Sequence, residues 1–277
     1  MSEMVSIENR GHVRHLVMNR PEKRNAFNRE LISALRDAAQ DALDSPDVRC
    51  VVLRGNGPSF SAGIDVFQLA GLGDTNMLRP FRKACIDMAN LFEEMPKPVI
   101  AQIHGACLGL GAEVALACDL RVMSDEATFG LPETRLGLIP DVGGSTRLPA
   151  VVGLGNAKEL IMTGRTIGAQ ECLRIGAANR VVPASELDAS AQSLVDELMA
   201  ASPIAVGLSK RVLDGVAKPT LAASLEQEVT IQQTLVATDD FREAGAAFME
   251  KRAPNWSGKL PGPRAPEEAA EPVPEKA

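Results

Sequence analysis

The sequence predicts an α/β protein, and two patterns along the chain carry that prediction. In the first half, short apolar, β-branched runs alternate with longer segments whose apolar residues recur at helical spacing. From about Gly143 onward, helical segments follow one another. Alternation of strands and helices is typical of crossover connections between strands. At 277 residues, the chain is long enough to bury a sizeable core.

The expected elements of the first half begin with a hairpin. Two extended segments, Met4–Glu8 and His12–Met18, lie on either side of Arg10 and Gly11. Asn28 is placed to cap a helix over 29–43, because asparagine is a preferred N-cap residue. There follow a strand over 48–53, a helix over 77–95, a strand over 97–105, a helix over 113–118 and a strand over 119–124.

The second half is expected to be mainly helical. Apolar spacing indicates helices over 157–162, 170–175, 186–201, 205–216, 221–237 and 241–252. The last twenty residues are rich in Pro, Glu and Ala and poor in apolar bulk, so we expect them to be disordered.

Composition and charge exclude several function classes. A net charge of −7 argues against broad binding to nucleic acid or anionic membranes. Five widely spaced cysteines without a CxxC pair indicate a reduced, cytoplasmic chain without disulfides or a metal site. No segment has the pattern of a signal peptide or a membrane span.

Three stretches have residue types suited to chemistry. In "FSAGID" (60–65), small residues allow a ligand to approach backbone N–H groups, although an ordinary turn also has this composition. In "GLGAEVALAC" (109–118), glycines precede a helix start, which favours negative charge. In "FGLPE" (129–133), Pro132 and Glu133 fit the first turn of a helix.

Glu113 is the most unusual residue among them. Between Val99 and Cys118 it is the only formally charged side chain. A carboxylate in apolar surroundings shifts its pKa or finds partners. Completion of the first helical turn is the plain alternative for Glu113, as helix capping is for Asp141. His104 is interpreted as a packed or hydrogen-bonded residue rather than a base.

Taken together, four motifs resemble the crotonase, or enoyl-CoA hydratase/isomerase, superfamily, with matching order and spacing from about residue 5 to residue 257. They are "NRPEKRNAFN" (19–28), "FSAGID" (60–65), "KPVIAQIHGACLGLGAEVALACDLRV" (97–122) and "FGLPETRLGLIPDVGGSTRLP" (129–149). The resemblance implies a spiral core of ββα units over 1–200 and a helical trimerisation region over 201–257, with 258–277 as a disordered acidic tail. It also implies a homotrimer or a dimer of trimers.

The resemblance also implies an acyl-CoA thioester substrate, with no cofactor beyond the CoA that the substrate carries. It places the thioester oxygen on the backbone N–H groups of Ile64 and Leu110, which form an oxyanion hole. Glu113 would deprotonate water and Glu133 would protonate the substrate Cα. The implied CoA-binding residues are Lys23, Arg24, Ala26, Ala62, Gly63, Asp65 and Lys251.

Three residues depart from the pattern of many hydratases. Leu110 stands where glycine is common, and Phe67 where some hydratases have lysine. Asp141 stands where a small residue is usual, and its context resembles dienoyl-CoA isomerases and some acyl-CoA hydrolases. We therefore expect an enoyl-CoA hydratase, with an isomerase that uses Asp141, a hydrolase, or a thioester-binding protein without turnover as alternatives.

Several apolar residues after the second motif fit either an acyl site or the core, and the core is favoured. They are Val66, Phe67, Leu69, Leu72, Met77 and Phe81.

Overall fold

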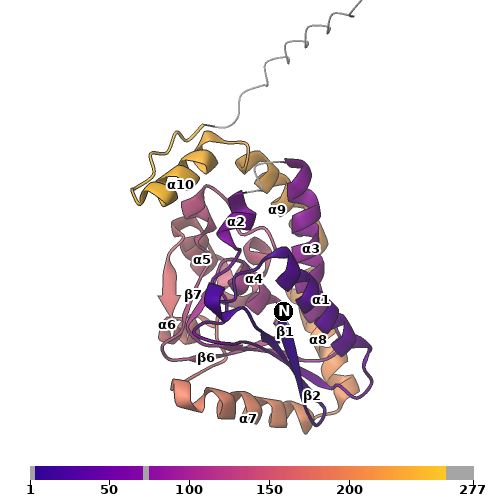
Figure 1. Ribbon diagram of the computed structural model, residues 1–277. Coiled ribbons are helices and arrows are strands. Elements are labelled where there is room, and N and C mark those ends of the chain that lie inside the picture. Colours follow the sequence, from indigo (N-terminus) through magenta and orange to yellow (C-terminus); the bar gives the residue numbers. More distant parts are fainter. Residues whose placement is uncertain (1–3, 71–74, 260–277) are drawn as a thin grey trace, which may run out of the picture.

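The computed structural model describes residues 4–70 and 75–259, and its centre is a six-stranded sheet (Figure 1). The strand order is β1-β2-β3-β4-β6-β9. The first two strands form the expected antiparallel hairpin and the later neighbours are parallel. The strands are β1 (Val5–Arg10), β2 (Val13–Met18), β3 (Cys50–Gly55), β4 (Val99–Ile103), β6 (Leu120–Ser124) and β9 (Arg180–Val182).

A second, three-stranded sheet contains β5 (Ala106–Leu108), β7 (Thr128–Gly130) and β8 (Thr166–Gly168). The β5–β7 pair is parallel and the β7–β8 pair is antiparallel. These strands were not expected from the sequence, because three residues are too few for a period of two to stand out. The C-terminal end of β5 leads directly into the segment that contains Glu113.

Amphipathic helices cover the main sheet on both faces. On one face, α1 (Arg29–Asp44) packs against α3 (Thr75–Glu94), and Asn28 caps α1 by accepting the N–H of Leu31, as predicted. On the other face, α7 (Leu187–Met199) covers apolar residues of β2, β3, β4 and β6 (Figure 1). The short helix α2 (Val66–Ala70) follows the "FSAGID" loop.

The remaining helices confirm the helical second half. They are α4 (Leu110–Ala117), α5 (Gly144–Thr163), α6 (Ala169–Ile175), α8 (Pro203–Ala217), α9 (Leu221–Leu235) and α10 (Asp239–Glu250), with 3-10 helices at η1 (Pro21–Lys23), η3 (Pro132–Leu136) and η4 (Ala184–Glu186). Helix α5 begins well before the expected residue 157. Pro149 and a non-helical Gly153 interrupt its sequence pattern and kink it.

The apolar residues after the second motif were expected to lie in the core. The structure describes the side chains of three of them, and only one is buried. Phe81 is buried, whereas Val66 and Phe67 on α2 are 52% and 76% exposed. The side chains of Leu69, Leu72 and Met77 lie outside what the structure describes, and so does most of the expected tail. Among the described residues, no helix is both long enough and apolar enough to cross a bilayer.

Candidate active site

Backbone hydrogen bonds join the first motif (19–28) to the second (60–65). Ala62 N–H donates to the carbonyl of Arg24, and Phe27 N–H donates to the carbonyl of Gly63. The Ser61 hydroxyl donates to the Asn25 carbonyl at 2.8 Å. These bonds fix the loop before α2 against the segment that follows η1. The residues implied in CoA binding at 23–26 and 62–65 are therefore brought together.

Two glycine turns meet beside this layer. Gly63 (φ 96°) and Gly109 (φ 52°) both have backbone conformations that favour glycine. A Cβ on Gly109 would lie 3.7 Å from the Gly63 Cα and 3.0 Å from Glu133 Oε1. The turns are thus packed against each other, with the Glu133 carboxyl next to them.

The residues after these glycines are Ile64 and Leu110, the two expected N–H donors. Leu110 is the first residue of α4, so its N–H has no partner within the helix. Within the described part of the chain, neither N–H donates to another backbone group. The sharp turn is made by Gly109, and Leu110 is helical, so the chain needs no glycine at 110.

Glu113 is buried, 2% exposed, in the first turn of α4. Its Oε1 accepts the N–H of Val142 at 2.7 Å and the N–H of Gly144 at 3.0 Å. Burial raises the pKa of Glu113, and these two N–H groups together with Arg82 oppose that rise. The two N–H donors favour the charged form of Glu113 and partly offset the effect of burial.

Glu133, in η3, has a different environment. The residue is partly exposed as a whole, but its Oε2 is enclosed and has no hydrogen-bond partner among the described residues. Burial and the negative charge of Glu113 raise the pKa of Glu133 well above its ordinary value. A charged Glu113 therefore disfavours the charged form of Glu133.

Asp141 is the third carboxyl of the cluster. The alternative interpretation, that Asp141 caps a helix, is wrong. Helix α5 is capped at Gly143, whereas Asp141 Oδ2 lies 2.8 Å from Nε of Arg82 in a buried ion pair. Burial raises the pKa of Asp141 to about 7, while Arg82 opposes the rise and Glu113 adds to it. Asp141 therefore lies with the two glutamates.

A fourth buried carboxyl, Glu228, comes from α9. Its Oε2 accepts the N–H of Gly143 at 2.8 Å, and its Oε1 accepts the Thr146 hydroxyl at 2.6 Å. Burial raises the pKa of Glu228 to about 8. The start of α5 therefore donates to Glu113 and to Glu228 from neighbouring N–H groups.

The other expected residues lie further out or have structural partners. Lys23 and Arg24 are exposed at η1, and Lys251 is exposed at the end of α10. The Asp65 carboxylate pairs with Arg20 at 2.6 Å and accepts the N–H of Phe67. His104 hydrogen bonds to the Gly57 carbonyl at 2.8 Å, in keeping with its expected packing role.

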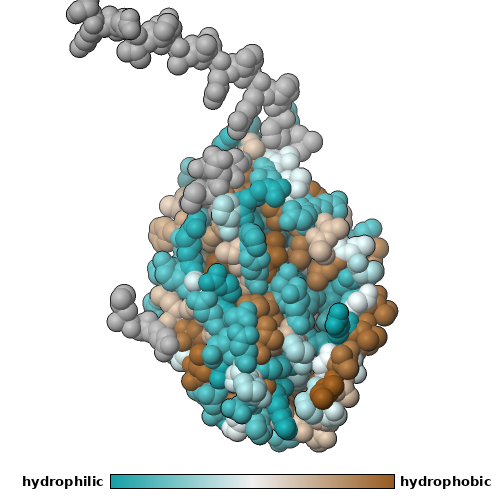
Figure 2. All heavy atoms as spheres, turned by 90° about the vertical axis from the view of Figure 1, so that its right-hand side faces the viewer, coloured by the Kyte–Doolittle hydropathy of each residue, from teal (hydrophilic) through white to brown (hydrophobic). Residues whose placement is uncertain are grey.

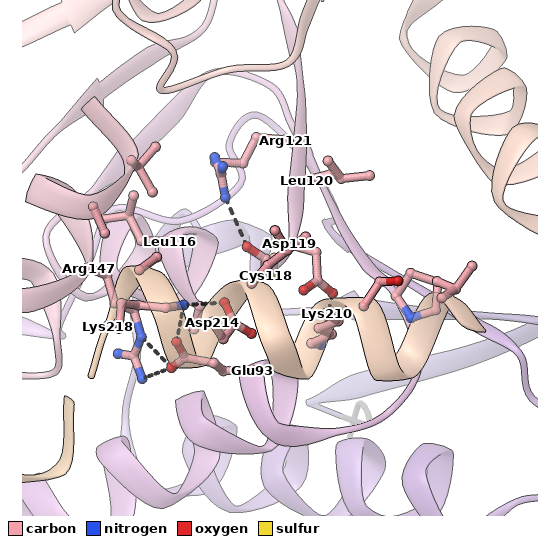
Figure 3. Close-up of a pocket in the computed structure, with 18 of the residues that line it drawn as sticks. Glu93, Leu116, Cys118, Asp119, Leu120, Arg121, Arg147, Lys210, Asp214 and Lys218 are labelled. Atoms are coloured by element: carbon pink, nitrogen blue, oxygen red, sulfur yellow. Dashed lines mark hydrogen bonds and ion pairs between the residues drawn. The ribbon is translucent and has the colours of Figure 1, made fainter. Parts of the chain in front are cut away.

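A separate pocket of about 650 Å³ lies between α8, the end of α4 and the first part of α5. Its charged side chains neutralise one another: Glu93 pairs with Arg147 and Lys218, and Lys218 also reaches Asp214 (Figure 3). The pocket does not include Glu113, Glu133 or Asp141. This pocket is therefore distinct from the carboxyl cluster, which is the candidate active site.

The sequence reasoning did not single out Arg82 or Glu228. The sequence does contain a sign of each, because each charged residue occupies an apolar position of its helix. Arg82 lies on the same face as Leu78 and Cys85, and Glu228 on the same face as Leu225. All five cysteines are buried and free, and the described residues contain no group of side chains arranged to hold a metal ion.

The fold is α/β, and a cluster of buried carboxyls lies beside the paired glycine turns. The family model for enoyl-CoA hydratase/isomerase matches residues 8–259, and the chain belongs to this family, within the crotonase superfamily. An enoyl-CoA isomerase/hydratase of Mycosarcoma maydis is 35% identical over 89% of this chain and 93% of its own. A crotonyl-CoA hydratase of Syntrophomonas wolfei is 34% identical over 93% of this chain and 99% of its own.

Solved structures agree with the fold. A crystal structure of an enoyl-CoA hydratase from Mycobacterium avium subsp. paratuberculosis K-10 superposes with a TM-score of 0.83, at 27% identity, over 92% of this chain and 98% of that one. The expected crotonase fold is therefore confirmed.

Proposed function

We propose that the protein is an enoyl-CoA hydratase that adds water across the 2,3 double bond of a 2-enoyl-CoA. The observation that carries the proposal is the placement of Glu113 and Glu133, with unlike environments, beside the paired turns at Gly63 and Gly109. The relatives named as hydratases support the same reaction class.

The N–H groups of Ile64 and Leu110 hold the thioester oxygen. Negative charge develops on that oxygen when water attacks C3, and two fixed donors stabilise it without reorganisation. Leu110 N–H also lies at the start of α4, where the helix dipole favours negative charge. Loss of one such donor typically costs about 10²–10³ in rate.

The two carboxyls divide the proton transfers. Glu113, whose charged form accepts two backbone N–H groups, takes a proton from water. The water oxygen bonds to C3, the π electrons move to the thioester oxygen, and C2 then takes a proton from Glu133. Glu133 is the group whose surroundings favour the protonated form. The environments thus support the assignment that the family resemblance implies.

We propose that the CoA portion lies over the backbone of Ala26, Ala62, Gly63 and Asp65. Lys23, Arg24 and Lys251 are exposed and positively charged, which suits phosphate groups. We also propose a homotrimer or a dimer of trimers, in which C-terminal helices form contacts.

The test is the loss of enoyl-thioester absorbance with crotonyl-CoA and with a longer 2-enoyl-CoA. Wild type should remove the band, and Glu113→Gln and Glu133→Gln should each lower kcat by about 10²–10⁴. Glu126→Gln, which changes an exposed glutamate between β6 and β7, is the matched control. Wild-type protein that leaves the band unchanged at every chain length would contradict the proposal.

An isomerase is the second candidate, and the position of Asp141 favours it. Asp141 lies in the carboxyl cluster with its pKa raised to about 7, a value suited to carrying a proton at neutral pH. The isomerase predicts conversion of 3-enoyl-CoA or dienoyl-CoA that Asp141→Asn abolishes. Turnover of these substrates at the wild-type rate by that variant rejects this candidate.

A further inference from the structure

Arg82 is a buried cation whose Nε–H has no hydrogen-bond partner among the described residues. Its side chain is 5% exposed, and its Nε forms an ion pair with Asp141 Oδ2 at 2.8 Å. The two atoms are close, but their geometry is not that of a hydrogen bond. Arg82 Nε is therefore enclosed without a hydrogen-bond partner. In the described part of the chain, no hydrogen bond from the other guanidinium nitrogens is found either.

This arrangement is costly unless a ligand completes it. A guanidinium has five N–H donors, and buried polar groups without hydrogen bonds destabilise the folded state. Other buried arginines of this chain are satisfied: Arg147 donates to Glu93, Asn90 and the Val142 carbonyl, and Arg121 to three carbonyls. Arg82 differs from them although it is buried to a similar degree.

The Arg82 guanidinium lies beside the carboxyl cluster, with its Nε next to Asp141. Arg82 interacts electrostatically with Asp141, Glu113 and Glu133. Asp141 Oδ2 is likewise enclosed without a hydrogen-bond partner among the described residues. The site therefore presents one donor, Arg82 Nε–H, and one acceptor, Asp141 Oδ2, which lie 2.8 Å apart and each lack a hydrogen bond, next to the groups proposed to carry the reaction.

A hydroxyl group complements both members of this pair. Its oxygen accepts from Arg82 while its hydrogen is donated to Asp141. A carboxylate would satisfy Arg82 but would have no hydrogen to donate to the charged form of Asp141. It would also add negative charge where Asp141 already compensates the guanidinium and Glu113 lies nearby.

We propose that Arg82 and Asp141 form a specificity site for a hydroxyl group on the acyl chain of the substrate, beyond the carbons that react. The proposal rests on the proposed function, because it assumes that an acyl-CoA thioester occupies the carboxyl cluster. It deepens that function by naming a substrate class: enoyl-CoA thioesters whose acyl chain is oxygenated at its far end.

The test is calorimetric binding of saturated acyl-CoA pairs, which needs no turnover. The probes are butanoyl-CoA against 4-hydroxybutanoyl-CoA and hexanoyl-CoA against 6-hydroxyhexanoyl-CoA. In wild type, one hydroxylated probe should bind about 10- to 100-fold more tightly than its parent, as expected for a hydrogen bond to a charged group. Equal affinity within both pairs would overturn the proposal.

Two variants separate recognition from folding. The double variant Arg82→Met, Asp141→Leu removes the buried pair without leaving one charge alone, and it should lose the preference for hydroxylated probes. Arg82→Lys keeps the charge but not the planar donors, and should retain only part of the preference. A preference unchanged in the double variant would overturn the proposal.

A carboxylated probe and a turnover assay complete the design. Glutaryl-CoA that binds more tightly than the hydroxylated probes would overturn the choice of an uncharged group. Wild-type hydration of crotonyl-CoA is measured in parallel. Hydration without a hydroxyl preference rejects the specificity site alone, whereas a hydroxyl preference without hydration of any 2-enoyl-CoA rejects the proposed function.

Discussion

At the scale of residues, four buried carboxyls near one another have different partners. Glu113 accepts two backbone N–H groups, Asp141 faces Arg82, and Glu228 accepts one N–H and one hydroxyl. Glu133 Oε2 accepts nothing within the described structure. Groups with such unlike surroundings hold protons over different pH ranges, which lets one act as base and another as acid.

The rate of hydration should fall as pH rises through the pKa of Glu133, because a general acid works only when protonated. The negative charge of Asp141 helps to raise that pKa. Asp141→Asn should therefore move the alkaline limb of the kcat/KM profile to lower pH. An alkaline limb that stays in place in this variant would show that Asp141 does not influence the acid.

Glu228 should make the fold less stable as pH rises. Its pKa is about 8 in the folded protein and near 4.5 in an unfolded chain, so the folded state binds more protons between these values. The Tm of wild type should therefore fall from pH 5 to pH 9 by at least about 2 °C more than that of Glu228→Gln. Parallel curves from differential scanning fluorimetry would contradict this.

The sequence predicted some of these residues better than others. Glu113 is the only formal charge in a long apolar stretch, so its unusual character is visible without a structure. Arg82 shares its helix with several other charges and Glu228 lies two residues from Glu226, so the apolar helix face suggests that Arg82 and Glu228 are buried but does not show what they contact. Their partners are distant in sequence, and a single chain does not reveal such pairings.

At the scale of elements, the site depends on turns that bring two backbones together. Gly63 and Gly109 precede the expected donors, and a Cβ would lie 2.9 Å from the Leu108 carbonyl oxygen at Gly63 and 3.0 Å from Glu133 Oε1 at Gly109. Long helices with regular apolar spacing were predicted well, as α1 and its cap at Asn28 show. The three-residue strands and the kinked α5 were not, because tertiary contacts rather than local pattern define them.

Gly109→Ala should damage both stability and activity. The conformation at φ 52° strains an alanine by about 1–3 kcal/mol. The added Cβ would also lie 3.0 Å from Glu133 Oε1, and the shift of the Leu110 N–H should lower kcat by about 10²-fold.

Gly155→Ala is the matched control. Gly155 lies in α5, and a Cβ there meets nothing within 4 Å. Its Tm, measured by thermal unfolding, and its hydration rate should equal or exceed those of wild type. A Gly109→Ala protein with wild-type kcat would argue against a donor at Leu110.

At the scale of the whole molecule, α8 presents an apolar face that the single chain does not cover. Ile204, Leu208, Val212 and Val216 recur every fourth residue and are between 58% and 78% exposed. The side of the molecule that carries α1, α3 and α8 is mostly hydrophilic, with an apolar area at its lower right (Figure 2). An apolar stripe of this kind is typical of a surface that binds another protein.

The proposed trimer should depend on this face. The double variant Leu208→Glu, Val212→Glu places two charges on it and should shift the sedimentation mass toward that of one chain of 29.4 kDa. Ile7→Glu changes an exposed apolar residue on β1 and should leave the mass unchanged. A trimer that survives in the α8 double variant would place the contact elsewhere.

The hydrogen bonds at the start of α5 also have a consequence for the order in which a ribosome completes this enzyme. The N–H groups that hold Glu113 belong to residues 142 and 144, and the intervening Gly143 is held by Glu228 of α9. Synthesis from the N-terminus produces the reacting carboxyls long before that anchor. The catalytic geometry is therefore completed only when nearly the whole chain has emerged, and a chain that stops short of α9 has both glutamates but lacks the support that orients them.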